Sequence, residues 1–316
     1  MAFQITRKES VQKAVRRIAG ELLRKNLVEL DKAEQCRDEV VHAVRKRCKR
    51  LRGLLRLVRP SLGKTYSREN QAIRDAARLL STSRDARSMI DTYDDLLAQL
   101  GPAAEADRFA PIRTELVFRL RRAGSEEIID QLSRFGKKMA AAEQRLDSWE
   151  LSANGFAAIE GGLRKTHRQA RCQMEQAWKQ PTSESLHEFR KQVKYHLYHV
   201  QILQELWPAL LKPYASELSR LGSLLGEDHN LAVLRTAVEA ESHCWGEEDQ
   251  RMAFLGLLDQ RRKQQLALAR PLGRRLFAES SRAWVKRIGS YWKVRAQRDA
   301  TAGQPRSDQP AAALQE

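Results

Sequence analysis

Two segments of this chain carry histidine and cationic side chains in the same order. The first segment, VHAVRKRCKRLR, begins at Val41, and the second, LHEFRKQVKYHL, begins at Leu186. His187 lies 145 positions after His42, which predicts an internal duplication. The same offset relates three cations of the two segments: Arg45 to Arg190, Lys46 to Lys191 and Lys49 to Lys194. Guanidinium, ammonium and imidazole groups donate hydrogen bonds to anionic oxygens, so the pattern indicates anion binding.

The first basic segment has the periodicity of a half-buried helix. At about 100° per residue its apolar positions form one seam. The seam consists of Val41, Val44, Cys48, Leu51, Leu55 and Val58. A cationic stripe directly beside it consists of His42, Arg45, Lys49, Arg52 and Arg56. At 1.5 Å per residue this stripe would extend roughly 21 Å along the edge between buried and exposed surface.

The second basic segment repeats the seam but has a shorter stripe. Its seam positions are Leu186, Phe189, Val193, His196, Val200 and Leu203. Its cationic positions are His187, Arg190 and Lys194. A further group at helical spacing is Arg164, Arg168 and Arg171. A solvated helix face explains that group equally well, and a hydrogen-bonded structural role remains open for His42 and His187.

The composition favours helices throughout the chain. Leu, Ala, Arg, Glu and Gln are abundant, and no strand pattern is present. Proline and glycine breaks near Pro60 to Gly63, Gly101, Gly124, Gly155, Pro181, Pro208 and Gly246 separate roughly ten to twelve helices. We therefore predict an all-α fold with a first half over residues 1–150 and a second half over residues 151–298. Residues 299–316 are small and polar and are predicted to be a disordered tail.

The charge balance indicates the kind of partner. A net charge of +17, from 57 Lys and Arg against 40 Asp and Glu, predicts attraction to polyanions. No apolar stretch approaches the ~20 residues of a membrane span, so we expect a cytoplasmic protein with no membrane contact. The cysteines form no C-x-x-C pair and are predicted to be reduced, buried thiols. His196 with His199, and His243 with Cys244, have no supporting ligand motif, so we expect no metal site and no cofactor.

A second pair of segments supports the duplication. LLSTSRDARSM in the first half corresponds to LLGEDHNLAVL in the second. At the same offset Arg84 matches His229 and Asp85 matches Asn230. Either these side chains cap or pack helix turns, or Arg84 and His229 point cations into the cavity of the basic stripes, with Asp85 holding a neighbouring arginine. Both interpretations remain open.

Taken together, these segments resemble the CHAD domain, the conserved histidine α-helical domain. The resemblance is carried by the two basic segments, the two turns just described, GLRKTHRQAR from Gly162 and LGRRLFAESSRAWVKRIGSYW from Leu272. It covers nearly the whole folded chain and implies two pseudo-symmetric four-helix bundles with extra helices. It also implies a basic central channel that binds inorganic polyphosphate. The residues expected to bind the polymer are His42, Arg45, Lys46, Lys49, Arg52, Arg56, Arg164, Arg168, His187, Arg190, Lys191 and Lys194.

The chain departs from the family pattern in three places. The second basic segment continues with Tyr195 to Tyr198 where arginine-rich turns are usual, and the usual Arg-Asp pair of the second turn is His229-Asn230. The first departure predicts weaker polymer binding by the second basic segment. The second departure removes an expected internal salt bridge. The E-x-E-x-K strand of a triphosphate-tunnel domain is missing, so tunnel-type triphosphatase chemistry is not expected.

Three functional classes follow from these features. The leading hypothesis is non-catalytic binding of inorganic polyphosphate, with attachment to polyphosphate granules as a consequence. Nucleic-acid binding by the same basic surface is the alternative, although the stripes lack interleaved aromatics and no helix-turn-helix is present. An enzyme would need Mg²⁺-binding carboxylates, a P-loop or an activated nucleophile, and none is found. Counterion release should make binding of any such polymer weaken as salt rises.

Overall fold

The secondary structure of the described chain is entirely helical, as predicted. The computed structural model describes residues 3–6, 9–33, 35–80, 82–99, 106–122, 126–240 and 244–302. The longer helices are α1 (Val11–Leu30), α2 (Arg37–Leu57), α4 (Lys64–Arg78), α5 (Thr82–Ala98), α6 (Ala110–Arg122), α7 (Glu126–Gln144), α8 (Ala157–Lys179), α9 (Ser183–Leu203), α10 (Pro208–Ala240), α11 (Glu248–Leu276) and α12 (Ser281–Ala302). The short elements are α3 (Arg59–Leu62), η1 (Ala106–Phe109), η2 (Leu146–Ser148) and η3 (Gln204–Leu206). None of the described helices is both long and apolar enough to span a bilayer.

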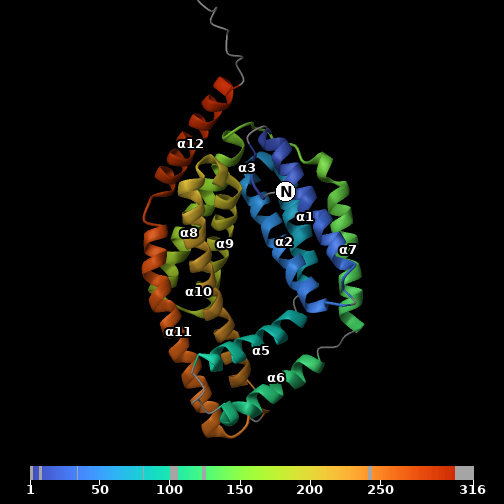
Figure 1. Cartoon of the computed structure of the whole chain (residues 1–316), viewed down its shortest axis with the longest axis vertical. Helices are drawn as coiled ribbons and strands as arrows, with labels where there is room; N and C mark the ends of the chain where they lie inside the picture. Colours follow the sequence, from blue (N-terminus) through green and yellow to red (C-terminus); the bar gives the residue numbers. More distant parts are fainter. Residues whose placement is uncertain are drawn as a thin grey trace, which may run out of the picture.

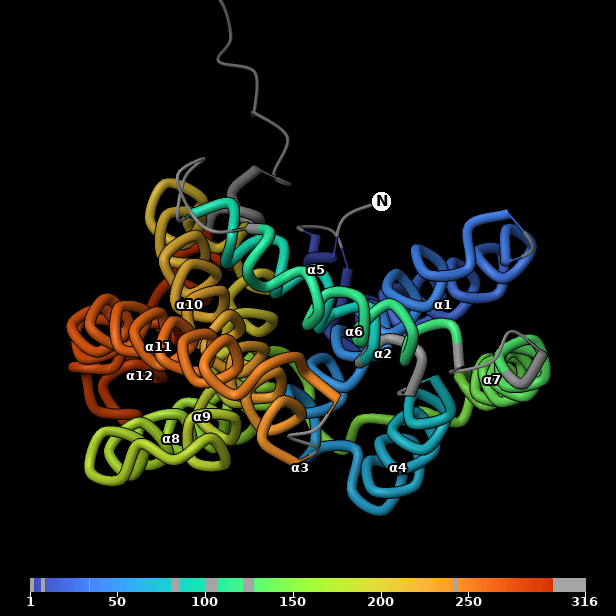
Figure 2. The backbone as a smooth tube through the Cα atoms, turned by 90° about the horizontal axis from the view of Figure 1, so that it is seen from below, coloured from blue at the N-terminus to red at the C-terminus, as the bar shows by residue number. Residues whose placement is uncertain are grey.

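The helices form two groups that lie side by side. In the first group α1, α2, α4 and α7 form a closed ring in which each helix packs on the next. In the second group α8 packs on α9, α9 on α10 and α10 on α11, while α12 covers α8. Figure 2 shows the two groups next to each other, with α5 and α6 running across one end from the first group to the second. The same arrangement is visible from the side in Figure 1.

The predicted breaks coincide with helix boundaries wherever the structure describes them. Pro60 lies in α3, Pro208 begins α10 and Pro181 lies between α8 and α9. Gly63, Gly155 and Gly246 have positive φ angles of 54°, 54° and 87°, a conformation that favours glycine. Gly101, Pro102 and Gly124 lie outside the described residues.

Both predicted apolar seams are buried. Every seam residue of α2, from Val41 to Val58, is at most 2% exposed, and the same holds for the α9 seam from Leu186 to Leu203. They belong to one large core that includes residues of both halves. A smaller core fixes the position of α5 and α6, because Ile90, Tyr93 and Ile112 pack there against Leu234 and Phe254 of α10 and α11.

Glycines allow α2 to approach the second helix group closely. A Cβ atom added to Gly53 of α2 would lie 2.8 Å from Tyr198 Cδ2 on α9. Next to this contact, the ring Nε2 of His199 is 3.0 Å from the Gly53 carbonyl oxygen. A Cβ atom on Gly162 of α8 would lie 1.9 Å from the backbone oxygen of Leu57. These contacts fix α2 against both α8 and α9.

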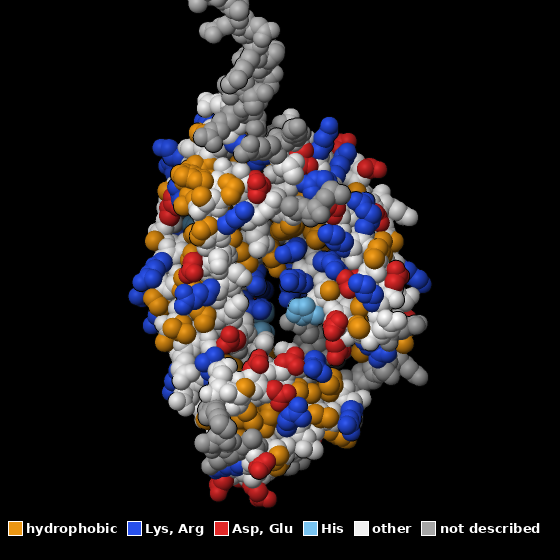
Figure 3. Space-filling view, viewed as in Figure 1, with side chains coloured by type: hydrophobic (Ala, Val, Ile, Leu, Met, Phe, Trp, Pro, Cys, Tyr) orange, Lys and Arg blue, Asp and Glu red, His pale blue; other side chains and the backbone are white. Residues whose placement is uncertain are grey.

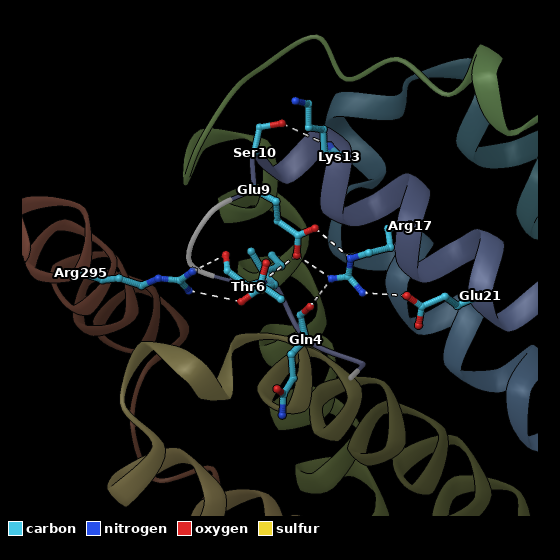
Figure 4. A network of polar contacts seen from close by, with 9 residues as sticks. Gln4, Thr6, Glu9, Ser10, Lys13, Arg17, Glu21 and Arg295 are labelled. Atoms are coloured by element: carbon cyan, nitrogen blue, oxygen red, sulfur yellow. Dashed lines mark hydrogen bonds and ion pairs between the residues drawn. The ribbon is translucent and has the colours of Figure 1, made fainter. Parts of the chain in front are cut away.

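The segment before α1 joins the first helix to the second group (Figure 4). The Arg17 guanidinium donates to Glu9, with Nε 2.9 Å from Oε2, and it also contacts Glu21 and the Gln4 carbonyl. This pairing lowers the pKa of Glu9 to about 2. The Ile5 N–H donates to the Ile202 carbonyl of α9 at 3.0 Å, and Arg295 of α12 donates to the Thr6 carbonyl.

Three histidines of the second group are buried without charge. His167, His196 and His199 are each 0% exposed. Burial lowers the pKa of His167 to about 4 and that of His199 to about 3, and it lowers the pKa of His196 as well. His196 faces Tyr214, whose hydroxyl is 3.4 Å away, whereas His199 faces the Gly53 carbonyl. The i, i+3 pair considered as metal ligands therefore points toward different partners, and His243 lies outside the described residues.

Some expectations differ from the structure or stay untested. Cys48 is buried, but Cys36 and Cys172 are exposed, so the prediction of buried thiols was wrong for those two. Helix α12 continues to Ala302, beyond the predicted end of the second half at residue 298, and residues 303–316 of the expected tail lie outside the described residues. The domain boundaries and the pseudo-twofold relation between the halves stay predictions.

We expect Gly162→Ala to destabilise the fold by at least about 2 kcal/mol, because the new methyl group would meet the α2 backbone instead of a flexible side chain. Gly256→Ala is the matched control, since a Cβ atom at this exposed position of α11 has no neighbour within 4 Å. It should stabilise the helix by about 0.5–1 kcal/mol. Urea denaturation of both variants measures the difference, and equal stabilities would contradict the close α2–α8 contact.

The buried histidines predict a loss of stability in acid. Their pKa values in the folded state lie below the value of about 6.5 in the unfolded chain, so the unfolded state binds more protons as the pH falls. Their contribution is complete above pH 6.5 and is lost toward pH 4, with roughly 2–6 kcal/mol lost by pH 5. Urea denaturation between pH 7 and pH 5 should show a shallower profile for His167→Phe than for the wild-type protein. A flat wild-type profile would exclude this role.

Candidate functional site

The basic faces of α2 and α9 meet in a pocket of about 490 Å³ beside their crossing. We call it the central pocket. Its described lining residues are Arg45, Lys49, Arg52, Ser88, Met89, His187, Arg190, Lys191, Lys194, Tyr195, Tyr198, His229, Asn230 and Val233. They come from α2, α5, α9 and α10. Figure 3 shows a hollow in the middle of this face, with Lys and Arg side chains (blue) and histidine (pale blue) on its walls.

A second hollow of about 580 Å³ continues from the central pocket toward α4, and we call it the α4-side hollow. It shares Arg45, Lys49, Arg52, His187, Lys191 and Tyr195 with the central pocket. It adds Arg56 of α2 and two arginines of α4, Arg74 and Arg78. The basic lining is therefore continuous from the helix crossing to the surface beside α4.

Neutral acceptors orient three arginines of the α2 stripe. Arg45 donates to the Ala77 carbonyl oxygen at 2.8 Å, and Arg52 donates to Asn70 Oδ1 at 3.1 Å. Arg56 donates to the same Asn70 oxygen at 3.0 Å and to the Tyr66 hydroxyl at 3.1 Å. All three acceptors belong to α4. These contacts fix the guanidinium groups of Arg52 and Arg56 without cancelling their charge.

In other parts of the described chain, buried carboxylates accept hydrogen bonds from arginines. Buried Glu69 accepts two hydrogen bonds from Arg145, at 2.8 and 2.9 Å, and buried Asp228 accepts one from Arg262 at 3.0 Å. Within the hollows Lys191 is in an ion pair with Glu188, and Arg74 and Arg78 are both in ion pairs with Asp75, while Lys194 has no ion pair with any described residue. The interior of the central pocket is thus a place where positive charge accumulates.

Two glycines of α10 allow the α9 cations to lie flat against the helix. A Cβ atom on Gly222 would be 3.3 Å from Lys194 Cδ, and one on Gly226 would be 3.0 Å from an Arg190 terminal nitrogen. The two glycines are one turn apart, as are Arg190 and Lys194. This contact holds both side chains along the pocket wall.

The electrostatics of the pocket oppose further positive charge. Burial lowers the pKa of Lys194, and the charges of Arg190, Lys46 and Arg50 lower it further. Burial is also the main cause of the lowered pKa of His187, followed by Lys191 and Arg190. Burial likewise lowers the pKa of Arg52. A bound polyanion would reverse this trend, because negative charge favours the protonated forms.

His229 is a member of the pocket that the sequence suggested but did not decide. Its ring centroid lies 4.3 Å from that of His187, so the two imidazoles form a pair across α9 and α10. The 145-residue offset to Arg84 was the available signal. The side chains of Arg84 and Asp85 lie outside the described residues.

Two tyrosines also line the pocket, although the stripes were expected to lack aromatics. The Arg56 guanidinium carbon lies 4.1 Å from the centroid of the Tyr195 ring. The Tyr198 ring packs on Gly53 and lies edge-on to Phe3, with centroids 6.2 Å apart. Other protein groups therefore already contact both tyrosine rings. The helical periodicity of the sequence did not predict that these tyrosines line the pocket.

Four of the predicted ligands line neither the central pocket nor the α4-side hollow. Exposed Lys46 affects Lys194 electrostatically without lining the cavity. Exposed His42 lines an adjoining hollow of about 910 Å³ between α2 and α5, which shares Ser88 and Asn230 with the central pocket and which we call the α5-side hollow. Arg164 and Arg168 are exposed on α8, and Arg164 is in an ion pair with Glu160.

The geometry is suited to holding a chain of negative charges. Arginine guanidinium groups, lysine ammonium groups and a histidine pair converge on one elongated cavity. The described residues include no group of three His, Cys, Asp or Glu side chains able to hold a metal ion. Contributions from Arg74, Arg78, Ser88 and Asn230 were not predicted, because nothing in their local sequence specifies which helix packs beside α2.

Comparisons with known proteins give a consistent assignment of the fold. The CHAD domain family matches residues 17–239, more than two thirds of the chain. The structure of PptA from Streptomyces chartreusis is 14% identical, with a TM-score of 0.54, over 83% of this chain and 98% of that chain. The CHAD domain from the plant Ricinus communis is 17% identical, with a TM-score of 0.53, over 93% of this chain and 95% of that chain. No curated protein sequence matches the chain.

We expect Lys194→Met to stabilise the protein by about 0.5–1 kcal/mol in phosphate-free buffer, because it removes a partly buried charge among other cations. Lys212→Met, at an exposed position of α10, is the control and should change the stability by less than about 0.5 kcal/mol. Thermal denaturation of both variants provides the comparison. Destabilisation by Lys194→Met would mean that the ammonium group has a favourable partner.

Proposed function

This chain belongs to the CHAD domain family, and from that membership we propose that it binds inorganic polyphosphate without catalysis in the central pocket. The observation that carries the proposal is the convergence of two cationic helices, α2 and α9, on one cavity. Neutral acceptors on α4 and glycines on α10 hold these cations in place. A site built in this way has positive charge ready for an anionic polymer.

Polyphosphate fits this arrangement because it is a flexible chain of repeated charge without bases. Guanidinium groups at Arg45, Arg52 and Arg190 would donate pairs of hydrogen bonds to phosphate oxygens. Lys49 and Lys194 would supply mobile charges from the two facing helices. His187 would gain a proton as the polymer binds, since the phosphate field favours imidazolium. The elongated cavity would contact several phosphate units at once.

The proposal includes no chemical step. The described lining of the central pocket contains donors and cations, and the carboxylate of the adjoining α4-side hollow, Glu188, is in an ion pair with Lys191. Attachment to polyphosphate granules follows as the cellular consequence, because a granule presents the same polymer at high local concentration.

Nucleic acid is the competing ligand, because its backbone has the same charge sign. Single-stranded nucleic acid usually gains affinity by stacking bases on aromatic rings. At the central pocket the Tyr195 ring is covered by Arg56, and Tyr198 is packed against Gly53 and Phe3. These contacts favour a ligand without bases.

Calorimetric titration with long-chain polyphosphate tests the proposal. We expect Arg45→Ala/Lys49→Ala/Arg190→Ala to lower the affinity at least about a hundredfold at low salt, because three charged donors are removed. The wild-type affinity should also fall steeply as salt rises to physiological strength, because counterions are released on binding.

The control is a triple variant with the same loss of charge, Lys137→Ala/Lys138→Ala/Lys179→Ala, at exposed positions of α7 and α8. It should bind nearly as well as the wild type. Equal losses in the two triple variants would indicate attraction by net charge alone. Tighter binding of DNA or RNA at the same phosphate concentration would favour the nucleic-acid alternative instead.

A further inference from the structure

The cationic stripe of α2 continues one step beyond the predicted residues. Arg59 follows Arg56 by three positions, which extends the alternating spacing of three and four that begins at His42. Arg59 begins α3, directly after the end of α2 at Leu57. The Tyr66 hydroxyl, which accepts a hydrogen bond from Arg56 at 3.1 Å, also interacts with Arg59. Arg59 therefore lies next to the outer end of the α4-side hollow.

Arg59 has donor atoms that no described residue uses. Its Nε and one terminal nitrogen are buried without a hydrogen-bond partner, and it has no ion pair with a described residue. Burial lowers its pKa, and the charges of Arg56 and Arg168 lower it further. A guanidinium group that is partly dehydrated and faces two other cations lacks a balancing negative charge.

Arg168 is brought to this place by the close packing of α8. A Cβ atom on Gly161 would be 2.9 Å from Pro60 Cγ, and Gly162 meets the Leu57 carbonyl. Arg168 follows Gly161 by seven residues, about two helical turns, so both lie on the same side of α8. Arg164 is on the same helix but is engaged by Glu160. Arg168 is exposed and has no ion pair with a described residue.

Near the N-terminal end of α2, the lining next to the central pocket contains more carboxylates than arginines. The α5-side hollow at the N-terminal end of α2 contains Asp38, Glu39, Asp91 and Asp95, together with Arg37, Arg87 and His42. Figure 3 shows carboxylates (red) gathered along the lower rim of the hollow, over α5. A polyanion is repelled by these carboxylates and attracted by the unbalanced arginines at the other end of α2.

We propose that a long polyphosphate leaves the central pocket at the C-terminal end of α2 and passes over Arg56 and Arg59 to Arg168 of α8. This outer path rests on the proposed function of the central pocket and adds a direction and a dependence on chain length. Short polymers fill the pocket and do not reach α8. Longer polymers gain affinity from Arg59 and Arg168.

The test compares tripolyphosphate with long-chain polyphosphate on the full-length protein. We expect Arg168→Gln to weaken long-chain binding about three- to tenfold at low salt and to leave tripolyphosphate binding unchanged, since one exposed phosphate contact is lost. The slope of log affinity against log salt for the long polymer should fall by about 0.7, as expected for one phosphate contact to a single-stranded polyanion. Arg59→Gln should behave in the same way, and because Arg59 is partly buried, the folded state of that variant is checked by thermal denaturation.

Lys179→Gln is the matched control, because it removes the same charge from the same helix at the exposed C-terminal end of α8. It should leave the binding of both polymers unchanged. Equal weakening by Lys179→Gln, equal weakening for both polymer lengths, or no effect of Arg168→Gln would each overturn the outer path. In all three cases wild-type binding to the central pocket stands. Failure of the wild type to bind either polymer would instead overturn the proposed function and the outer path with it.

Discussion

Close contact between α2 and its neighbours α8 and α9 is the constraint on which the site depends. Gly53 admits the Tyr198 ring, and Gly162 admits the Leu57 carbonyl, so three helices meet with little space between their backbones. Because the cationic stripe of α2 lies directly beside its buried seam, this contact carries the stripe to the edge of the α9 surface. A looser crossing would separate Lys49 from Lys194 and open the cavity to bulk water, which screens charge.

The accumulation of cations has a stability cost that the rest of the fold offsets. Burial lowers the pKa values of Lys194, His187 and Arg52, which means that the pocket disfavours the charged forms of these side chains. The continuous core across both helix groups and the buried Glu69–Arg145 pair stabilise the surrounding scaffold. Neutral groups such as Asn70 then orient the arginines without removing the charge that a polyanion would need.

Much of the helix pattern could be predicted from the sequence, whereas only part of the candidate site could. The seams of α2 and α9 are buried as expected, since a period of 3.6 residues is a local property of each helix. Arg45, Lys49 and Arg190 line the central pocket, but His42 and Lys46 do not, although all five belong to the same repeated motif. The motif specifies a cationic face, while the angle at which two helices cross decides which part of the face is enclosed.

The sequence by itself determined the all-α fold, the positions of most described helix breaks, the buried seams and the sign of the charge along α2. These features depend on residues within a few turns of one another, which is the range of helical periodicity and turn chemistry. Only the tertiary structure decided that α4 supplies Asn70 and Tyr66, that His229 faces His187, and that Arg59 lies near Arg168. Those contacts join residues of different helices, and they arise from how the helices pack against one another.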